Sequence, residues 1–155
     1  MDEGTIFTLI LAAYGAGLAT VQAILRIAER RRRVNVTVAW GLGVSGGRPE
    51  GSALFVVSAT NPGVRDVTLS SAGFILPDKR SFLLLQTPGL ALPHRLEEGA
   101  NCGFWLDPRG VAVNLKYEGL GGKVSVVGYF GDTVGRVYKS EPTEFDIDSN
   151  LPVAG

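Results

Sequence analysis

The feature that most constrains this chain is an apolar run near its beginning. Residues 5–25 read TIFTLILAAYGAGLATVQAIL and contain no charged side chain. As a helix rising 1.5 Å per residue, this run would be roughly 31 Å long, close to the hydrocarbon thickness of a bilayer. Membrane helices tolerate residues such as Gly15 and Gly17, and no proline interrupts the run. The run therefore predicts one transmembrane helix.

Two other interpretations of the run stay open. A buried core helix would show a polar face, and this run has none. A cleaved signal peptide would begin with basic residues, whereas Asp2 and Glu3 stand there and no convincing A-x-A site follows the run. A retained span fits the residues best.

A cluster of arginines follows the apolar run and predicts its orientation. It holds five of the fifteen basic residues: Arg26, Arg30, Arg31, Arg32 and Arg33. Because Lys and Arg close to a span stay in the cytoplasm, we expect a single-pass protein of the cell membrane, with its N-terminus outside and the rest of the chain cytoplasmic. We interpret the five arginines as a membrane anchor that contacts lipid headgroups.

Beyond the arginine cluster the chain reads as short strands. Residues 34–40, VNVTVAW, alternate apolar and polar side chains, which is typical of a half-buried strand. From residue 34 onward, ten basic residues face twelve acidic ones, so we expect no nucleic-acid partner. Strands separated by turns rich in glycine, proline and asparagine are predicted over residues 34–40, 53–59, 67–76, 81–85, 102–106, 123–130 and 136–139.

One segment between these strands has the pattern of a short helix. Asp107 is a good N-cap, Pro108 suits the first turn, and Gly119 suits the position after the last turn. The predicted fold class is therefore all-β: an Ig-like two-sheet antiparallel sandwich with one short crossover helix, preceded by an N-terminal transmembrane helix. The predicted division is 1–33 for the span and basic segment, 34–148 for the sandwich, and 149–155 for a disordered tail.

The order of these features carries a resemblance. After the span and the arginines come VNVTVAW, then SATNPGVRDVTL, LPHRLEEG and GDTVGRVYKS. This order is similar to small uncharacterised bacterial single-span membrane proteins with an Ig-like β-sandwich domain. The resemblance covers nearly the whole chain and implies the fold and the anchoring. It implies no activity and no catalytic residue.

The search for catalytic and ligand-binding residues predicts no enzyme. The single Cys102 and the single His94, with Asp107 or Asp132 to orient them, form the one nucleophilic arrangement that the sequence allows. Cys102 precedes Phe104 and Trp105 in a predicted strand, where it would be buried and inert. We therefore predict no catalytic residue.

No metal site or cofactor is predicted either. One His and one Cys cannot complete a zinc site. Asp146, Asp148 and Asn150 imitate the start of a calcium loop, but Leu151 stands where glycine is required. The stretch GLGGK over residues 119–123 lacks the first glycine and the Ser or Thr of a phosphate-binding loop.

The sequence favours a membrane-anchored interaction module at the cytoplasmic face, with membrane lipid and a protein as its partners. The longest predicted loop, 86–101, is the candidate partner surface, with Pro93, His94, Arg95, Glu97 and Glu98. The spacing of Ala13 with Gly17, and of Gly15 with Ala19, also allows self-association through the span. The alternatives are an extracytoplasmic envelope or virion-associated structural sandwich, and an enzyme that uses Cys102 and His94.

Overall fold

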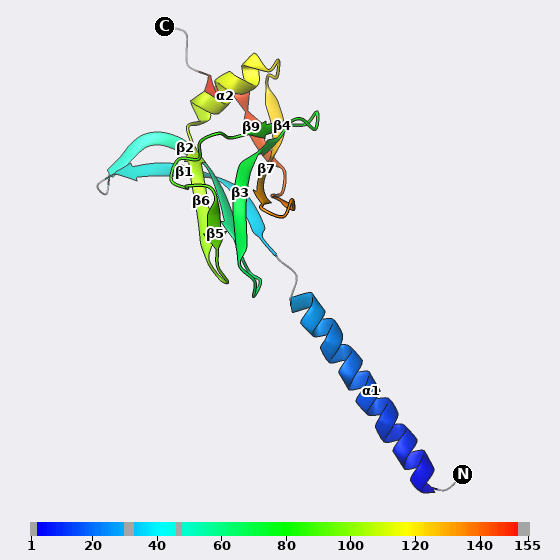
Figure 1. The fold of residues 1–155 in the computed structure, drawn as a ribbon. Helices are drawn as coiled ribbons and strands as arrows, with labels where there is room; N and C mark the ends of the chain where they lie inside the picture. Colours follow the sequence, from blue (N-terminus) through cyan, green and yellow to red (C-terminus); the bar gives the residue numbers. More distant parts are fainter. Residues whose placement is uncertain (1–2, 30–32, 46–47, 152–155) are drawn as a thin grey trace.

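The computed structural model describes residues 3–29, 33–45 and 48–151 of the 155-residue chain (Figure 1). Three helices and nine strands lie within these ranges. Their bounds are α1 (Glu3–Glu29), β1 (Asn35–Ser45), β2 (Arg48–Thr60), β3 (Val67–Ile75), β4 (Ser81–Leu83), β5 (His94–Leu96), β6 (Asn101–Leu106), α2 (Pro108–Tyr117), β7 (Lys123–Asp132), β8 (Val137–Lys139), β9 (Thr143–Asp146) and α3 (Ile147–Asn150).

The strands form two antiparallel sheets packed as a β-sandwich. The three-stranded sheet has the order β1-β2-β6, and the larger sheet has the order β4-β3-β7-β8. Two further strands join the larger sheet, since β5 pairs with β3 and β9 pairs with β7. The mostly-β architecture with two antiparallel sheets confirms that part of the predicted fold class.

The sandwich core follows from the alternation of side chains along the strands. In β2, Phe55, Val57 and Ala59 are fully buried, while the residues between them are only partly buried. Aromatic rings join the two sheets: Phe104 of β6 and Phe130 of β7 meet edge to face, with ring centroids 5.6 Å apart. Such contacts add to the free energy gained by burying the rings.

Helix α2 carries the chain from the smaller sheet to the larger one, as the sequence predicted. The carboxylate of Asp107 accepts a hydrogen bond from the backbone N–H of Arg109 at 3.1 Å, and Pro108 opens the helix. Gly119 follows the helix with a φ of 84°, a conformation that favours glycine. The predicted N-cap and C-terminal glycine are both confirmed.

Three elements were not predicted from the sequence. β5 lies within the predicted loop 86–101, and β9 and α3 follow the last predicted strand. Ser149 and Asn150 were assigned to a disordered tail, but they belong to α3. Leu151, also assigned to that tail, is partly buried, and residues 152–155 lie outside the described residues.

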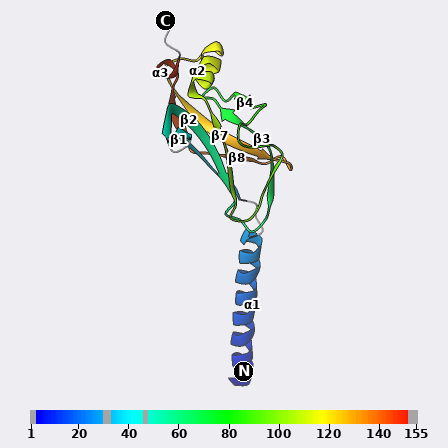
Figure 2. The same ribbon diagram turned by 90° about the vertical axis from the view of Figure 1, so that its left-hand side faces the viewer.

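Helix α1 stands apart from the sandwich (Figures 1 and 2). Within the residues that the structure describes, no helix is long and apolar enough to cross a membrane. Residues 11–26 of α1, the part whose side chains are described, include the weakly apolar or polar residues Tyr14, Gly15, Gly17 and Thr20. They also include Gln22 and Arg26. This finding contradicts the predicted transmembrane helix.

The predicted localisation was derived from that helix and is contradicted with it. A single-pass protein of the cell membrane, with its N-terminus outside and a cytoplasmic β domain, is not supported. Of the five predicted anchor residues, Arg26 lies exposed in the last turn of α1 and Arg33 lies exposed before β1. The other three, Arg30, Arg31 and Arg32, lie outside the described residues.

Candidate binding pocket beneath helix α2

An apolar pocket of about 200 Å³ lies between the two sheets beneath α2. The smaller sheet contributes Phe55 and Leu106 to its wall. The larger sheet and α2 complete the wall with Phe74, Val126, Val111 and Leu115. Figure 1 places α2 at the end of the sandwich that is farthest from α1. A concave and mostly apolar site of this kind is the usual form of a binding pocket.

The pocket has two polar lining residues, Asp107 and Asn114, and both make hydrogen bonds within the helix. The Asp107 carboxylate caps α2, and the Asn114 side-chain amide donates to the carbonyl oxygen of Gly110 at 2.9 Å. Their hydrogen-bonding capacity is therefore partly used within the helix. The pocket favours an apolar ligand group, because transfer of such a group from water is favourable and requires no polar partner.

Gly110 contributes to the open volume of the pocket. This residue lines the pocket, and a Cβ atom built at this position meets nothing within 4 Å. Its φ is not positive, so the backbone there accepts other residues. A larger side chain at position 110 would therefore begin at the pocket wall and take up space in it.

Strand β4 forms one side of the pocket and also one edge of the larger sheet. Phe82 of β4 and Leu84 just after it line the pocket, while Leu83 at the end of β4 and Leu85 beyond it are 52% and 91% exposed. β4 pairs only with β3 within the described strands. Edge strands with exposed apolar side chains are unusual, because proteins generally protect such edges from pairing with other chains.

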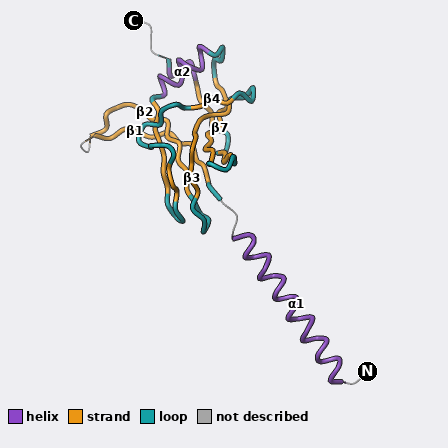
Figure 3. Tube along the Cα trace, viewed as in Figure 1, coloured by secondary structure: helices purple, strands orange, loops and turns teal. Residues whose placement is uncertain are grey.

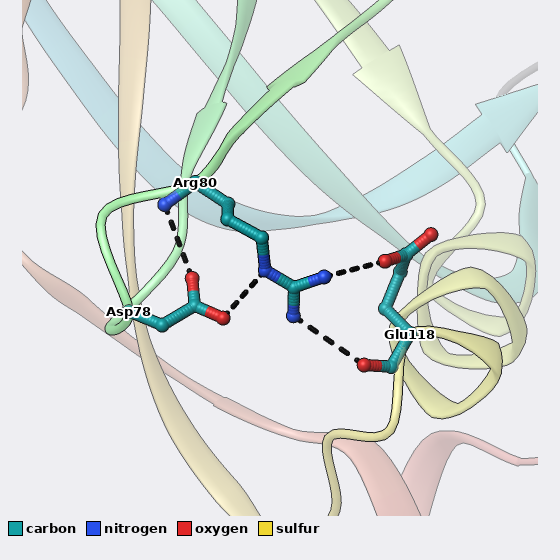
Figure 4. Close-up of polar contacts among 3 residues, drawn as sticks. All are labelled: Asp78, Arg80 and Glu118. Carbon is teal, nitrogen blue, oxygen red and sulfur yellow. Dashed lines mark hydrogen bonds and ion pairs between the residues drawn. The ribbon is translucent and has the colours of Figure 1, made fainter.

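An arginine joins the turn before β4 to the end of α2 (Figure 4). Arg80 Nε lies 2.6 Å from Asp78 Oδ2, and a terminal guanidinium nitrogen lies 2.6 Å from Glu118 Oε2. A backbone hydrogen bond from Arg80, and then its side chain, lower the pKa of Asp78 below its ordinary value. The ion pairs are exposed to solvent, so we assign them a positioning role.

A second polar contact holds the other side of α2. Asp148 of α3 accepts hydrogen bonds from Lys116 Nζ at 3.1 Å and from the backbone N–H of Gly122 at 2.8 Å. Asp146 caps α3 through the backbone N–H of Ser149. The two carboxylates that imitate a calcium loop therefore support α3 and α2. The described residues contain no group of three acidic, histidine or cysteine side chains that could hold a metal ion.

The surface predicted from the sequence lies at the other end of the sandwich, near the start of β1. Arg95 of β5 forms an ion pair with Asp66, with Arg95 Nε 2.9 Å from the carboxylate. The other predicted residues are Pro93, Glu97 and Glu98, which are exposed, and His94, which is partly buried. Four of the five, all except His94, are therefore on the surface, but none of them lines the pocket.

The structure places Cys102 and His94 in different sheets. Cys102 in β6 is opposite Ala59 of β2, while His94 in β5 is opposite Leu69 of β3. Burial raises the pKa of the Cys102 thiol to about 11. The thiol is therefore protonated near neutral pH, and a protonated thiol is a poor nucleophile.

Sequence reasoning did not find the pocket, because its walls come from six strands and helices spread over residues 55–126. One local signal was present. Residues 81–85 read SFLLL, and alternation would place Leu83 and Leu85 on one face of a strand and Phe82 and Leu84 on the other. A short strand with apolar residues on both faces indicates contacts on both faces.

Comparisons with known proteins identify no family. No protein-family model and no curated protein matches the chain. Among solved structures, a protein described as ApaA from Bordetella pertussis has 12% identity and a TM-score of 0.41, covering 79% of this chain and 97% of its own. The structural-genomics target SoR45 has 10% identity and a TM-score of 0.33, covering 82% and 95%. Likeness at this level identifies neither a family nor an activity.

Proposed function

We propose that this chain is a protein-interaction module that binds an extended segment of a partner protein. The segment lies along the outer edge of β4, and one of its apolar side chains enters the pocket beneath α2. The observation that carries the proposal is an apolar pocket directly beside an edge strand, β4, that ends in an exposed leucine, Leu83. Binding of this type takes affinity from main-chain hydrogen bonds and specificity from side-chain pockets.

The size of the pocket supports one anchor side chain. An engineered cavity of roughly 150 Å³ lined by apolar side chains binds benzene. The pocket beneath α2, at about 200 Å³, has room for one aromatic or branched aliphatic side chain. A few buried anchors of this kind dominate the binding energy of most interfaces.

The hydrogen bonds of β4 leave one side of its backbone for a partner. Leu84 N–H donates to the carbonyl of Ala72, and Leu76 N–H donates to the carbonyl of Arg80. In an antiparallel ladder, backbone groups alternate between the two sides of the strand. The backbone groups of Ser81 and Leu83 therefore face away from β3, where an added strand would pair with them.

The test is selection of binding peptides from a displayed random library with the full chain as bait. The selected peptides are expected to share one large apolar residue and to bind in extended form. Replacing that residue with alanine should weaken binding at least about tenfold, the equivalent of roughly 1.4 kcal/mol. Selection of no such peptide would contradict the proposal.

Two variants of α2 test whether the pocket receives the anchor. Gly110→Leu fills the pocket and should abolish peptide binding, measured by isothermal titration calorimetry. Val113→Leu changes an exposed residue of the same helix, which does not line the pocket, and should leave binding unchanged. Equal effects of the two substitutions would show that the peptide does not use the pocket.

Backbone methylation of the selected peptide tests the pairing with β4. A methyl group on an amide that pairs with the strand should abolish binding, whereas the same group on the next amide should have little effect.

The paired variants Glu97→Ala and Glu98→Ala test the surface near β5. If these two weaken binding and Gly110→Leu does not, the partner surface is the one predicted from loop 86–101.

A further inference from the structure

Helix α1 carries a stripe of large side chains with the spacing of a helix-pairing seam. Over residues 11–26, where side chains are described, the large apolar residues are Leu11, Tyr14, Leu18, Val21, Ile24 and Leu25. All except Ile24 repeat at alternating intervals of three and four positions. This repeat places them at the a and d positions of successive heptads.

Among the residues that the structure describes, none of the sandwich covers the seam. Its five side chains are between 47% and 69% exposed, and α1 extends away from the strands in both views (Figures 1 and 2). The positions outside the seam are mostly small or polar: Ala12, Ala13, Ala16, Ala19, Thr20 and Ala23. A heptad repeat of 3.5 residues matches another helix, because only a helix presents the complementary holes.

The positions beside the seam allow a close approach. Gly15 and Gly17 flank Tyr14 and Leu18, and a Cβ atom at either glycine would meet nothing within 4 Å. Small residues at a helix interface let the two backbones come close together and increase their van der Waals contact. The seam and the glycines therefore favour one kind of occupant, a helix.

Charge at the two ends of α1 indicates that the helix that packs on the seam is α1 of a second copy of the chain. Asp2 and Glu3 stand at its beginning in the sequence, and Arg26 lies in its last turn with further arginines beyond it. A parallel pair would bring the arginines of both copies together. The order of charges along the sequence, acidic at the start of α1 and basic at its end, is complementary when the two helices run antiparallel, and such complementarity fixes orientation.

From these observations we infer that α1 forms an antiparallel two-helix pair with α1 of a second copy, along the seam Leu11, Tyr14, Leu18, Val21 and Leu25. The pair joins two sandwiches, and each keeps its own pocket beneath α2. This inference is independent of what the pocket binds. If a partner presents the binding segment twice, the pair also raises the avidity for that partner.

Sedimentation of the full chain tests the pairing. The wild-type chain should be a dimer, and Leu18→Asn should raise the dimer dissociation constant at least about tenfold, because the seam loses a buried leucine. Ala16→Asn is the matched control: it introduces the same residue two positions away, outside the seam, and should leave the dimer intact. A monomeric wild-type chain, aggregates larger than a dimer, or equal effects of the two substitutions would overturn the inference.

Spin-label distances test the orientation, with Cys102→Ser as the background so that only introduced cysteines carry labels. A mixture of chains labelled at Ala12→Cys and at Ala23→Cys should give a short inter-label distance. Chains labelled only at Ala12→Cys should give a longer distance, because the two labels would be offset by about 16 Å along the helix axis at 1.5 Å per residue. A short distance between two labels at position 12 would show a parallel pair and overturn the antiparallel assignment.

Discussion

The side-chain nitrogen Nδ2 of Asn61 lies 3.1 Å from the carbonyl oxygen of Leu96, although the two residues are 35 positions apart in the chain. The same nitrogen donates to the carbonyl of Arg65 at 2.8 Å, and the Asn61 side-chain oxygen accepts from the backbone N–H of Gly63. Asn61 is fully buried. One side chain therefore holds the turn after β2 against the end of β5.

We predict that Asn61→Ala destabilises the chain by about 2–4 kcal/mol. The substitution leaves buried carbonyl groups without a donor, at roughly 1–3 kcal/mol for each such group. Urea unfolding followed by circular dichroism measures the loss. Asn101→Ala, at an exposed asparagine, should change the free energy of unfolding by less than about 0.5 kcal/mol. A similar loss in both variants would contradict the assigned role of Asn61.

Gly89 and Trp105 form a tight contact that predicts a second effect. Gly89 has a φ of 84°, and a Cβ atom there would overlap the indole ring of Trp105. Gly89→Ala should therefore cost at least about 2 kcal/mol and change tryptophan fluorescence, because it combines backbone strain with displacement of the ring.

Gly99→Ala is the control for the Gly89 substitution. Gly99 also has a positive φ, 70°, but a Cβ atom there meets nothing within 4 Å. This variant should cost about 1 kcal/mol from backbone strain alone and leave the fluorescence unchanged. Equal losses of stability in the two variants would mean that the contact with Trp105 contributes nothing.

We predict that Gly110→Ala stabilises the chain by about 0.5–1 kcal/mol. Alanine lowers the entropy cost of forming α2, and its methyl group meets open space. Gly128→Ala should have the opposite effect, because a Cβ atom there lies 2.6 Å from Val38 Cγ2 and 3.2 Å from Val57 Cγ1. Thermal unfolding of both variants checks the two signs.

The pKa of Cys102 predicts a change of stability at alkaline pH. Burial raises this pKa from 9.0 to about 11, so above pH 9 the folded chain holds a proton that the unfolded chain releases. The contribution of the Cys102 thiol to the free energy of unfolding should therefore fall as the pH rises from 9 to 11. Cys102→Ala should remove that part of the pH dependence. Slow modification of the folded thiol by iodoacetamide at pH 8, and fast modification in urea, is the companion measurement.

Local sequence patterns predicted helix α2 and the first strand. Helix α2 begins after Asp107 and ends before Gly119, where its cap residues indicated. The alternating stretch at residues 34–40 lies in β1, with Val34 immediately before the strand. These signals depend on residues within one turn or one strand, which a single sequence displays directly.

Elements stabilised by distant contacts could not be predicted in this way. β5 has only three residues and is held by pairing with Val67–Leu69 of β3 and by Asn61. β9 is defined by its pairing with the first half of β7. The pocket likewise depends on how α2 rests across two sheets, so its position follows from the tertiary fold.

The transmembrane prediction treated length and lack of charge as sufficient. Within residues 11–26, the apolar side chains are unevenly placed, with small residues and Gln22 between the members of the seam. Among the described residues, these small and polar side chains leave the helix too weakly apolar to span a membrane, although its charge-free length suggested a span. Figure 3 shows one long helix, α1, followed by a body made mainly of strands with the short helix α2 at its far end.

Helix α2 is covalently continuous with both layers of the sandwich: β6 leads into it, and β7 follows it after a short turn. A ligand bound beneath α2 would push on a helix that is joined to both sheets, so any displacement of the helix would be transmitted to both. Because Arg80 and Asp148 hold the helix from opposite sides, its lateral displacement would require at least one of these contacts to break. The ten residues of α2 therefore both cover the candidate pocket and connect the two sheets.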